Sequence, residues 1–191
     1  MKVVIIGAGA AGLGIGWRLA QRGAEVTVLE RAQPARGATW AAAGMIAPVG
    51  EGVDGAQAEF GRKSSALWPA FAAELEARSS VEIDYRRNGA LFIAPDEESA
   101  HVLGERTLVE DGLELLNTPQ AREREPMLTP LISGGAWAAE EAQVDNRALG
   151  RALAQAFQSA GGKLLRNEQV MRFEIYEGKV FGVRSTFKLH G

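Results

Sequence analysis

The sequence predicts an α/β protein that opens with a β-α-β unit. Residues 3–6 are all β-branched, which is typical of a short buried strand. Five glycines then fall between positions 7 and 16, and the spacing of Leu13, Trp17 and Ala20 predicts a helix over residues 10–22. Residues 25–30 (EVTVLE) predict a second strand. Parallel strands joined by a crossover helix are almost always right-handed, so the unit has one expected topology.

The next part of the chain predicts a loop followed by a long helix. Residues 36–52 are rich in glycine and alanine, and a short helix is expected around residues 40–45. Aromatic and leucine side chains recur at helical spacing over residues 57–79 and predict an amphipathic helix. Pro69 lies inside that pattern, so a kink or a break is expected there.

The remaining segments alternate between strand-like and helix-like patterns. Thr118 is expected to cap a short helix over residues 118–125. Either Asp145 or Asn146 is expected to cap a helix over residues 146–160. The other expected elements are a charged helix over residues 96–110 and strands over 81–85, 90–94, 134–139, 163–166, 169–176 and 179–185, the last two joined by a Glu177-Gly178 hairpin.

The composition fits a globular protein and narrows the classes of partner. The 191 residues are 46% hydrophobic and 24% charged, with a net charge of −3. Such a chain lacks the basic balance that nucleic acid requires, so nucleic acid is not an expected partner. The absence of cysteine excludes disulfides and thiolate metal sites and fits a cytoplasmic location. No stretch approaches the ~18 apolar residues of a membrane span, and the early glycines argue against a secretory signal.

A glycine-rich loop lies between the first strand and the first helix. Gly7-Ala8-Gly9-Ala10-Ala11-Gly12 fits the pattern G-x-G-x-x-G. In that pattern Gly7 makes the tight turn, Gly9 lets the backbone approach a pyrophosphate, and Gly12 lets the helix pack closely on the strand. The helix N-terminus adds free N–H groups and a positive dipole end. The loop therefore predicts a dinucleotide site.

An acidic residue ends the second strand at the spacing that such a site requires. Glu30 follows Gly12 by 18 residues, near the ~20 expected of the carboxylate that accepts hydrogen bonds from a ribose. Arg31 comes next and is included with the cofactor-binding residues, although a solvated surface charge is the simpler interpretation.

The segment over residues 37–48 (GATWAAAGMIAP) bears on which dinucleotide is bound. Its small residues would let a short helix start pass close to a bulky planar ring, with N–H groups facing a polar edge. An alanine-rich turn packed on the core explains the same residues. On physical grounds both interpretations remain open.

Other candidate chemistry in the sequence is weaker. Glu97 and His101 have the spacing of two metal ligands on a helix, but no third ligand is suggested, so a solvated helix face is expected. The pair Glu140-Glu141 is likewise expected at the surface, and His190 is expected to be disordered. No metal site is predicted.

Taken together, these segments resemble a known family. The Gly7–Gly12 loop, Glu30 and Ala41-Ala42-Ala43-Gly44-Met45 are similar to the D-amino-acid-oxidase-type FAD-dependent oxidoreductases, above all to their glycine oxidase members of thiamine biosynthesis. Further segments agree in chain order over residues 81–94, 125–137 and 143–162. The resemblance covers essentially the whole chain, but only the N-terminal half of the longer chains of that family.

The resemblance implies non-covalently bound FAD and a role for each motif. Glu30 would hold the adenosine ribose, the loop with Gly7, Gly9, Ala10, Ala11 and Gly12 would hold the pyrophosphate, and Val170 would offer backbone N–H and C=O to the adenine. Thr39 and the backbone of Trp40, Ala41, Ala42, Ala43, Gly44 and Met45 would line the flavin, with Met45 near the substrate side of the ring. Trp40 is a departure, because the family often has a small hydroxyl residue there.

The resemblance also implies a Rossmann-like FAD-binding domain with part of an antiparallel-sheet substrate domain, the whole truncated. Residues 1–80 and 143–191 are expected to form two segments of the FAD-binding domain, and residues 81–142 part of the substrate domain. The arginine and tyrosine that hold the substrate in the family lie in the absent half, so no catalytic residue is assigned. An open sheet edge would favour a companion chain or a homo-oligomer.

The implied activity is oxidation of an amine. A primary or secondary amine of a small amino acid such as glycine or sarcosine would be converted to an imine, with dioxygen reduced to peroxide. The alternative is a non-catalytic or split-subunit dinucleotide-binding module, because half of the family's length is missing. An NAD-binding domain is a third interpretation, and it leaves residues 37–48 without a purpose.

Overall fold

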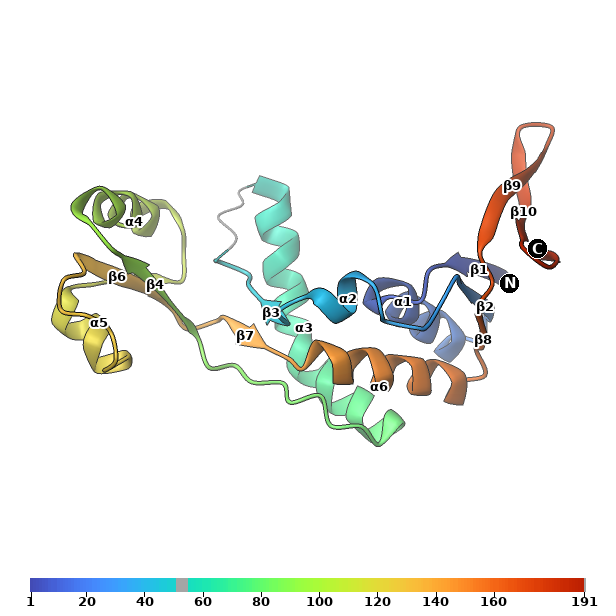
Figure 1. Cartoon of the computed structure of the whole chain (residues 1–191), viewed down its shortest axis with the longest axis horizontal. Coiled ribbons are helices and arrows are strands. Elements are labelled where there is room, and N and C mark those ends of the chain that lie inside the picture. The colour runs from blue at the N-terminus through green and yellow to red at the C-terminus, as the bar shows by residue number, and fades with distance from the viewer. Residues whose placement is uncertain (51–54, 191) are drawn as a thin grey trace. The chain divides into compact units, whose positions relative to one another are not determined.

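The computed structural model describes residues 1–50 and 55–190, which form two compact units (Figure 1). Unit 1 consists of Met1–Gly44, Ala70–Asp84 and Asp145–Gly191, and unit 2 of Met45–Pro69 and Tyr85–Val144. Neither unit is a continuous stretch of sequence, and residues 45–69 group with unit 2. The assignment of residues 1–80 and 143–191 to an FAD-binding domain, and of residues 81–142 to part of a substrate domain, stays a prediction.

Unit 1 contains the predicted β-α-β unit. The strands β1 (Lys2–Ile6), β2 (Glu25–Glu30) and β8 (Lys163–Arg166) form a parallel sheet in the order β1-β2-β8. The helices α1 (Ala10–Gln21) and α6 (Asn146–Ser159) pack against each other. A Cβ on Gly16 of α1 would lie only 3.1 Å from the Phe157 ring of α6, so the two helices approach closely. Side chains that are almost fully buried here include Leu13, Trp17, Val28, Leu153 and Phe157.

The start of α6 is fixed by an acidic cap. The Asp145 carboxylate accepts hydrogen bonds from the backbone N–H groups of Arg147 (2.8 Å) and Ala148 (2.9 Å), which the helix itself cannot pair. The bond from Ala148 is the main reason why the pKa of Asp145 lies below its ordinary value. Of the two expected caps, Asp145 is therefore the one used.

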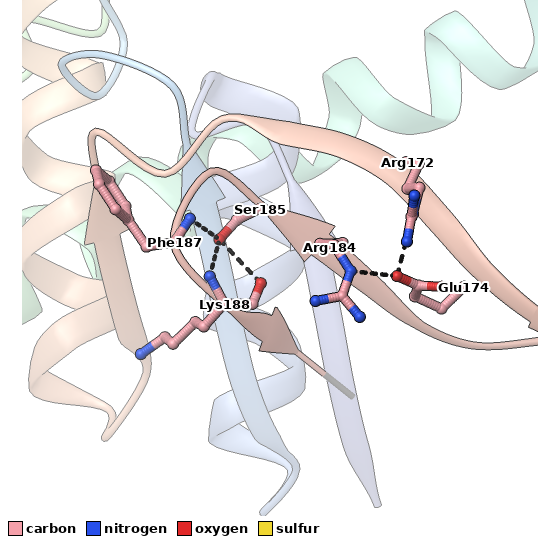
Figure 2. Close-up of polar contacts among 6 residues, drawn as sticks. All are labelled: Arg172, Glu174, Arg184, Ser185, Phe187 and Lys188. Carbon is pink, nitrogen blue, oxygen red and sulfur yellow. Dashed lines mark hydrogen bonds and ion pairs between the residues drawn. The ribbon is translucent and has the colours of Figure 1, made fainter.

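A small antiparallel sheet follows in unit 1. It contains β9 (Val170–Tyr176), β10 (Lys179–Ser185) and β11 (Leu189–His190), in the order β11-β10-β9. On one face Glu174 accepts hydrogen bonds from Arg172 (3.2 Å) and Arg184 (2.5 Å), as Figure 2 shows. The Arg184 hydrogen bond is the largest cause that holds the pKa of Glu174 below its ordinary value.

The turn into β11 is closed by a single serine. The Ser185 hydroxyl accepts hydrogen bonds from the backbone N–H groups of Phe187 (3.3 Å) and Lys188 (3.2 Å) (Figure 2). His190 then pairs with Val183, and its side chain is only 8% exposed. The expectation that His190 is disordered is wrong, because strand pairing and burial hold it in place.

Unit 2 contains an antiparallel sheet of its own. The strands β4 (Ala90–Ala94), β5 (Leu113–Leu116) and β6 (Gly134–Ala138) form a sheet in the order β4-β6-β5. The helices α4 (Glu97–Val109) and α5 (Thr118–Arg124) contribute Leu103 and Ala121 to two small buried clusters with strand residues. The short strands β3 (Met45–Ile46) and β7 (Ala142–Gln143) pair separately.

Four expectations about the elements need correction. Helix α3 (Gly55–Ser79) continues through Pro69, so a break there is wrong. The short helix α2 (Ala38–Ala41) begins before the expected position, and Asn117 rather than Thr118 caps α5, because its side chain accepts from Gln120 N. Strands β3, β5, β7 and β11 were not among the expected elements.

The expected strand over residues 81–85 is also wrong. The N–H of Ile83 donates to the Glu76 carboxylate (2.8 Å), and its C=O accepts from Asp145 N (2.9 Å). Asp84 then has a φ of 52°, which no regular strand contains. The backbone groups of this segment are thus used by α3 and by the residue that caps α6, not by a neighbouring strand.

A buried carboxylate organises the loop after β3 in unit 2. The Glu141 side chain is 1% exposed, and its Oε1 accepts hydrogen bonds from the N–H groups of Val49 (2.9 Å) and Gly50 (2.8 Å). Its neighbour Glu140 is exposed and forms an ion pair with Arg87. The expectation that both acids lie at the surface is right for Glu140 and wrong for Glu141.

This contrast yields a prediction. Glu141→Ala leaves two backbone N–H groups without an acceptor and should lower the free energy of unfolding by about 2–3 kcal/mol. Glu140→Ala removes only an exposed ion pair and should cost less than about 1 kcal/mol. Urea unfolding of both variants measures the difference, and Glu141→Gln, which keeps Oε1 as an acceptor, should restore most of the loss. Equal unfolding midpoints for the two alanine variants would contradict the proposed role of the Glu141 carboxylate in holding this loop.

Candidate functional site

The glycine-rich loop of unit 1 forms a tight turn between β1 and α1. Gly7 has a φ of 98°, a conformation that side chains other than glycine rarely adopt. Its N–H donates to the carbonyl of Leu29 at the end of β2 (2.8 Å). The loop is therefore joined directly to the neighbouring strand, and α1 begins three residues later, at Ala10.

Two further glycines allow close approach around this turn. A Cβ on Gly12 would run into the carbonyl oxygen of Gly7, which is backbone and cannot swing aside. A Cβ on Gly9 would lie 3.3 Å from the Thr39 hydroxyl. That hydroxyl accepts a hydrogen bond from Ala10 N (3.0 Å), so Thr39 lies over the start of α1.

Glu30 connects the loop to the chain that follows β2. One carboxylate oxygen accepts from Ala8 N (2.9 Å) and the other from Ala32 N (3.0 Å). Ala8 in turn offers its carbonyl to the N–H of Ala35 (2.8 Å), a residue with a φ of 57°. The acid is thus positioned beside the glycine-rich loop, as its spacing in the sequence predicts.

A groove of about 520 Å³ opens at this place, and we call it the glycine-loop groove. Its walls come from the ends of β1 and β2, the loop over residues 31–37, α2 and the start of β9. Six of the predicted site residues line it together: Gly7, Gly9, Glu30, Arg31, Thr39 and Val170.

The other predicted residues lie outside the walls of this groove. Ala10, Ala11 and Gly12 form the first turn of α1. Trp40 lines a different groove of unit 1. Ala41, Ala42 and Ala43 are exposed, Gly44 has a φ of 81°, and Met45 is an exposed residue of unit 2.

Two site residues were missed from the sequence. The Asn146 side-chain amide donates to the carbonyls of Thr39 (2.5 Å), Trp40 (3.2 Å) and Ala42 (2.7 Å) and so holds α2 at the start of α6. Glu168 lines the glycine-loop groove, and its buried Oε2 has no hydrogen-bond partner in the described chain, although His190 Nε2 lies 3.7 Å away. The only sequence signal at Asn146 was its position as a possible helix cap. No sequence signal pointed to Glu168.

The described residues contain neither a cluster of metal ligands nor a membrane-spanning helix. Within residues 1–50 and 55–190, no three histidine or acidic side chains come together as metal ligands. His101 lies 3.3 Å from Glu105, and both side chains are largely exposed. None of the described helices combines the length and the apolar character needed to cross a bilayer.

Comparison with known proteins adds independent evidence. A family model described as FAD dependent oxidoreductase matches residues 2–190. A bifunctional protein ThiO/ThiG of Nostoc sp. is 36% identical over 185 residues, which are 96% of this chain and 28% of that protein. A glycine oxidase of Geobacillus kaustophilus is 33% identical over 182 residues, 88% of this chain and 46% of that protein.

Solved structures agree with these sequence matches. The crystal structure of glycine oxidase from Geobacillus kaustophilus has a TM-score of 0.92 at 29% identity and covers 98% of this chain and 52% of that one. L-proline dehydrogenase from P. horikoshii has a TM-score of 0.83 at 24% identity, which shows a shared fold. The chain therefore spans about half the length of these relatives, or less.

The close approach at Gly12 yields a prediction. Gly12→Ala should lower the free energy of unfolding by about 1–3 kcal/mol, because the added methyl group has to displace the backbone of Gly7. The matched control is Gly14→Ala on the same helix, where a Cβ meets nothing within 4 Å. That control should be stabilising by about 0.5–1 kcal/mol through helix propensity. Thermal unfolding distinguishes the two, and a neutral Gly12→Ala would show that the loop can relax.

Proposed function

Since the chain belongs to the family of FAD dependent oxidoreductases, we propose that it binds FAD non-covalently and forms the N-terminal half of a glycine-oxidase-type enzyme. The observation that carries this proposal is the glycine-loop groove, where the G-x-G-x-x-G turn, Glu30 and Thr39 meet. The proposed reaction oxidises a primary or secondary amine of a small amino acid, such as glycine or sarcosine, to an imine, with peroxide formed from dioxygen.

The residues present fit this cofactor. The backbone of Gly9 is free of a Cβ where a pyrophosphate would approach, and the helix α1 adds its positive dipole end. Each Glu30 carboxylate oxygen accepts one backbone N–H and keeps a lone pair that would accept from a ribose hydroxyl, and Val170 lines the same groove with its peptide groups. Glu30 and Val170 would hold the adenosine part, and Gly7, Gly9, Ala10, Ala11 and Gly12 the pyrophosphate.

When bound, FAD would supply the redox chemistry for the oxidation of the amine. The work of this chain is then binding and orientation. Thr39 and the exposed stretch Ala41–Met45 would lie along the flavin, with Asn146 holding the carbonyls of Thr39, Trp40 and Ala42 so that the stretch keeps one conformation. Arg31 contributes positive charge at the edge of the groove.

The relatives suggest further properties that we carry over as proposals. The ThiO/ThiG and glycine oxidase relatives support a role in thiamine biosynthesis. The cytoplasmic location expected from the cysteine-free sequence remains a prediction, as do a companion chain and a homo-oligomer. The chain covers 28% to 46% of those two relatives. The second candidate function is a dinucleotide-binding module that is either non-catalytic or one subunit of a split enzyme.

Flavin binding is the first test. The purified chain, mixed with FAD and passed through gel filtration, should elute with the visible absorption bands of flavin. Glu30→Ala should weaken FAD binding by about tenfold or more, since hydrogen bonds to a charged group are lost. The matched control is Glu25→Ala, at the other end of β2, whose carboxylate pairs with Lys163 at the surface. A protein that stays colourless with added FAD would refute binding by this chain.

Turnover by the isolated chain tests the second candidate function. We expect the FAD-loaded chain alone to produce no hydrogen peroxide from glycine or sarcosine, because no substrate-binding arginine could be assigned in it. A peroxide assay under air measures this directly. Peroxide formed by the isolated chain would show that half the length of the relatives suffices for catalysis, and would refute the module.

A further inference from the structure

Unit 1 has a second groove, which is lined by arginines. It has a volume of about 670 Å³ and lies between the loop over residues 33–36, Trp40, the outer face of α6 and the end of β8. We call it the arginine groove. Four arginines line it and no aspartate or glutamate does: Arg36, Arg147, Arg151 and Arg166.

These four arginines form no ion pairs in the part of the chain that the structure describes. Over residues 1–50 and 55–190, none of them forms a salt bridge, whereas six other arginines each pair with a glutamate: Arg18, Arg87, Arg106, Arg124, Arg172 and Arg184. Asp145 feels the charges of Arg147 and Arg151, but its Oδ1 is occupied by the N–H groups that begin α6. Positive charge thus collects in one hollow of a chain whose net charge is −3.

The walls of the groove are held firmly. The guanidinium carbons of Arg36 and Arg147 lie 3.6 Å and 4.2 Å from the centre of the Trp40 ring, which favours a fixed position for both cations. A Cβ on Gly150 would run into the methyl group of Ala35, so the loop lies directly against α6. Arg147 and Arg151 are one helical turn apart, and their side chains therefore project from the same face.

The chemistry of this lining selects a class of ligand. A guanidinium group presents a planar fork of N–H donors that matches the oxygens of a phosphate, and several such groups together favour a multiply charged anion. The amide of Gln155 and the hydroxyl of Ser159 add neutral donors at the same walls. A hollow of this size suits a small soluble molecule better than the flat surface of a membrane.

We propose that the arginine groove binds a small soluble molecule carrying two or more phosphate groups, such as a nucleoside diphosphate or triphosphate. The groove shares Gln33, Ala35 and Arg36 with the glycine-loop groove, so the ligand would lie beside the proposed FAD site without occupying it. Arg151 and Arg166, which line only the arginine groove, are the residues that separate the two sites.

The test uses tripolyphosphate as the probe and isothermal titration of the whole chain. We expect one tripolyphosphate per chain, with an affinity that falls as salt is raised. The double variant Arg151→Gln/Arg166→Gln should bind at least about tenfold more weakly, because two charge-assisted contacts are lost. The control Arg22→Gln/Arg62→Gln removes the same charge from exposed positions outside both grooves and should stay within about twofold of the original chain.

Three outcomes decide the proposal. Tripolyphosphate binding that persists with excess FAD and is lost only in the Arg151/Arg166 variant supports it, and this result holds whether or not FAD binds. Equal affinities of the two double variants refute it. Binding that FAD abolishes and the arginine variant leaves unchanged would place the probe in the glycine-loop groove and also refute it.

Two further controls complete the design. Equal melting temperatures of the chain and its variants ensure that a loss of affinity is not a loss of fold. Sedimentation with phosphatidylcholine vesicles containing phosphatidylinositol bisphosphate tests a lipid headgroup as the source of phosphate. Vesicle binding without binding of free tripolyphosphate would overturn the assignment to a soluble ligand.

Discussion

The close approach of α1 to the turn after β1 is the constraint on which the rest of unit 1 depends. It exists because Gly12 has no Cβ beside the carbonyl oxygen of Gly7. From this turn, Ala8 directs its N–H to Glu30 and its carbonyl to the N–H of Ala35. The end of β2 and the loop that follows are therefore positioned by hydrogen bonds to one short segment. The shape of both grooves depends on this segment.

Local signals made this part of the molecule predictable. The glycine spacing, the strand over residues 25–30 and the acid at its end each depend on neighbours close in sequence, and the structure has them as predicted. The cap of α6 also depends on residues close in sequence, which limit the candidates to Asp145 and Asn146. Pro69 predicts a kink or a break, and the structure excludes the break, since α3 runs without interruption from Gly55 to Ser79.

The features that escaped prediction depend on partners far apart in the chain. Two-residue strands such as β3 and β7 have no periodicity to detect and exist only through their pairing. As one of two adjacent acids, Glu141 is predicted to lie at the solvated surface. Its burial is explained by hydrogen bonds from N–H groups of a loop some ninety residues earlier. The arginine groove collects residues from a loop, a helix and a strand end, so no local pattern announces it.

The interleaved path of the chain has a consequence for its synthesis on the ribosome. The first strand pair and α1 emerge early, yet their third strand β8 and the covering helix α6 follow only after all of the strands β3 to β7. Until Phe157 emerges, the α1 surface around Gly16 has Val28 of β2 as a neighbour but lacks the Phe157 ring that covers it in the complete fold. The nascent chain therefore exposes apolar surface of α1 during most of its elongation, and chaperones commonly bind chains in such a state.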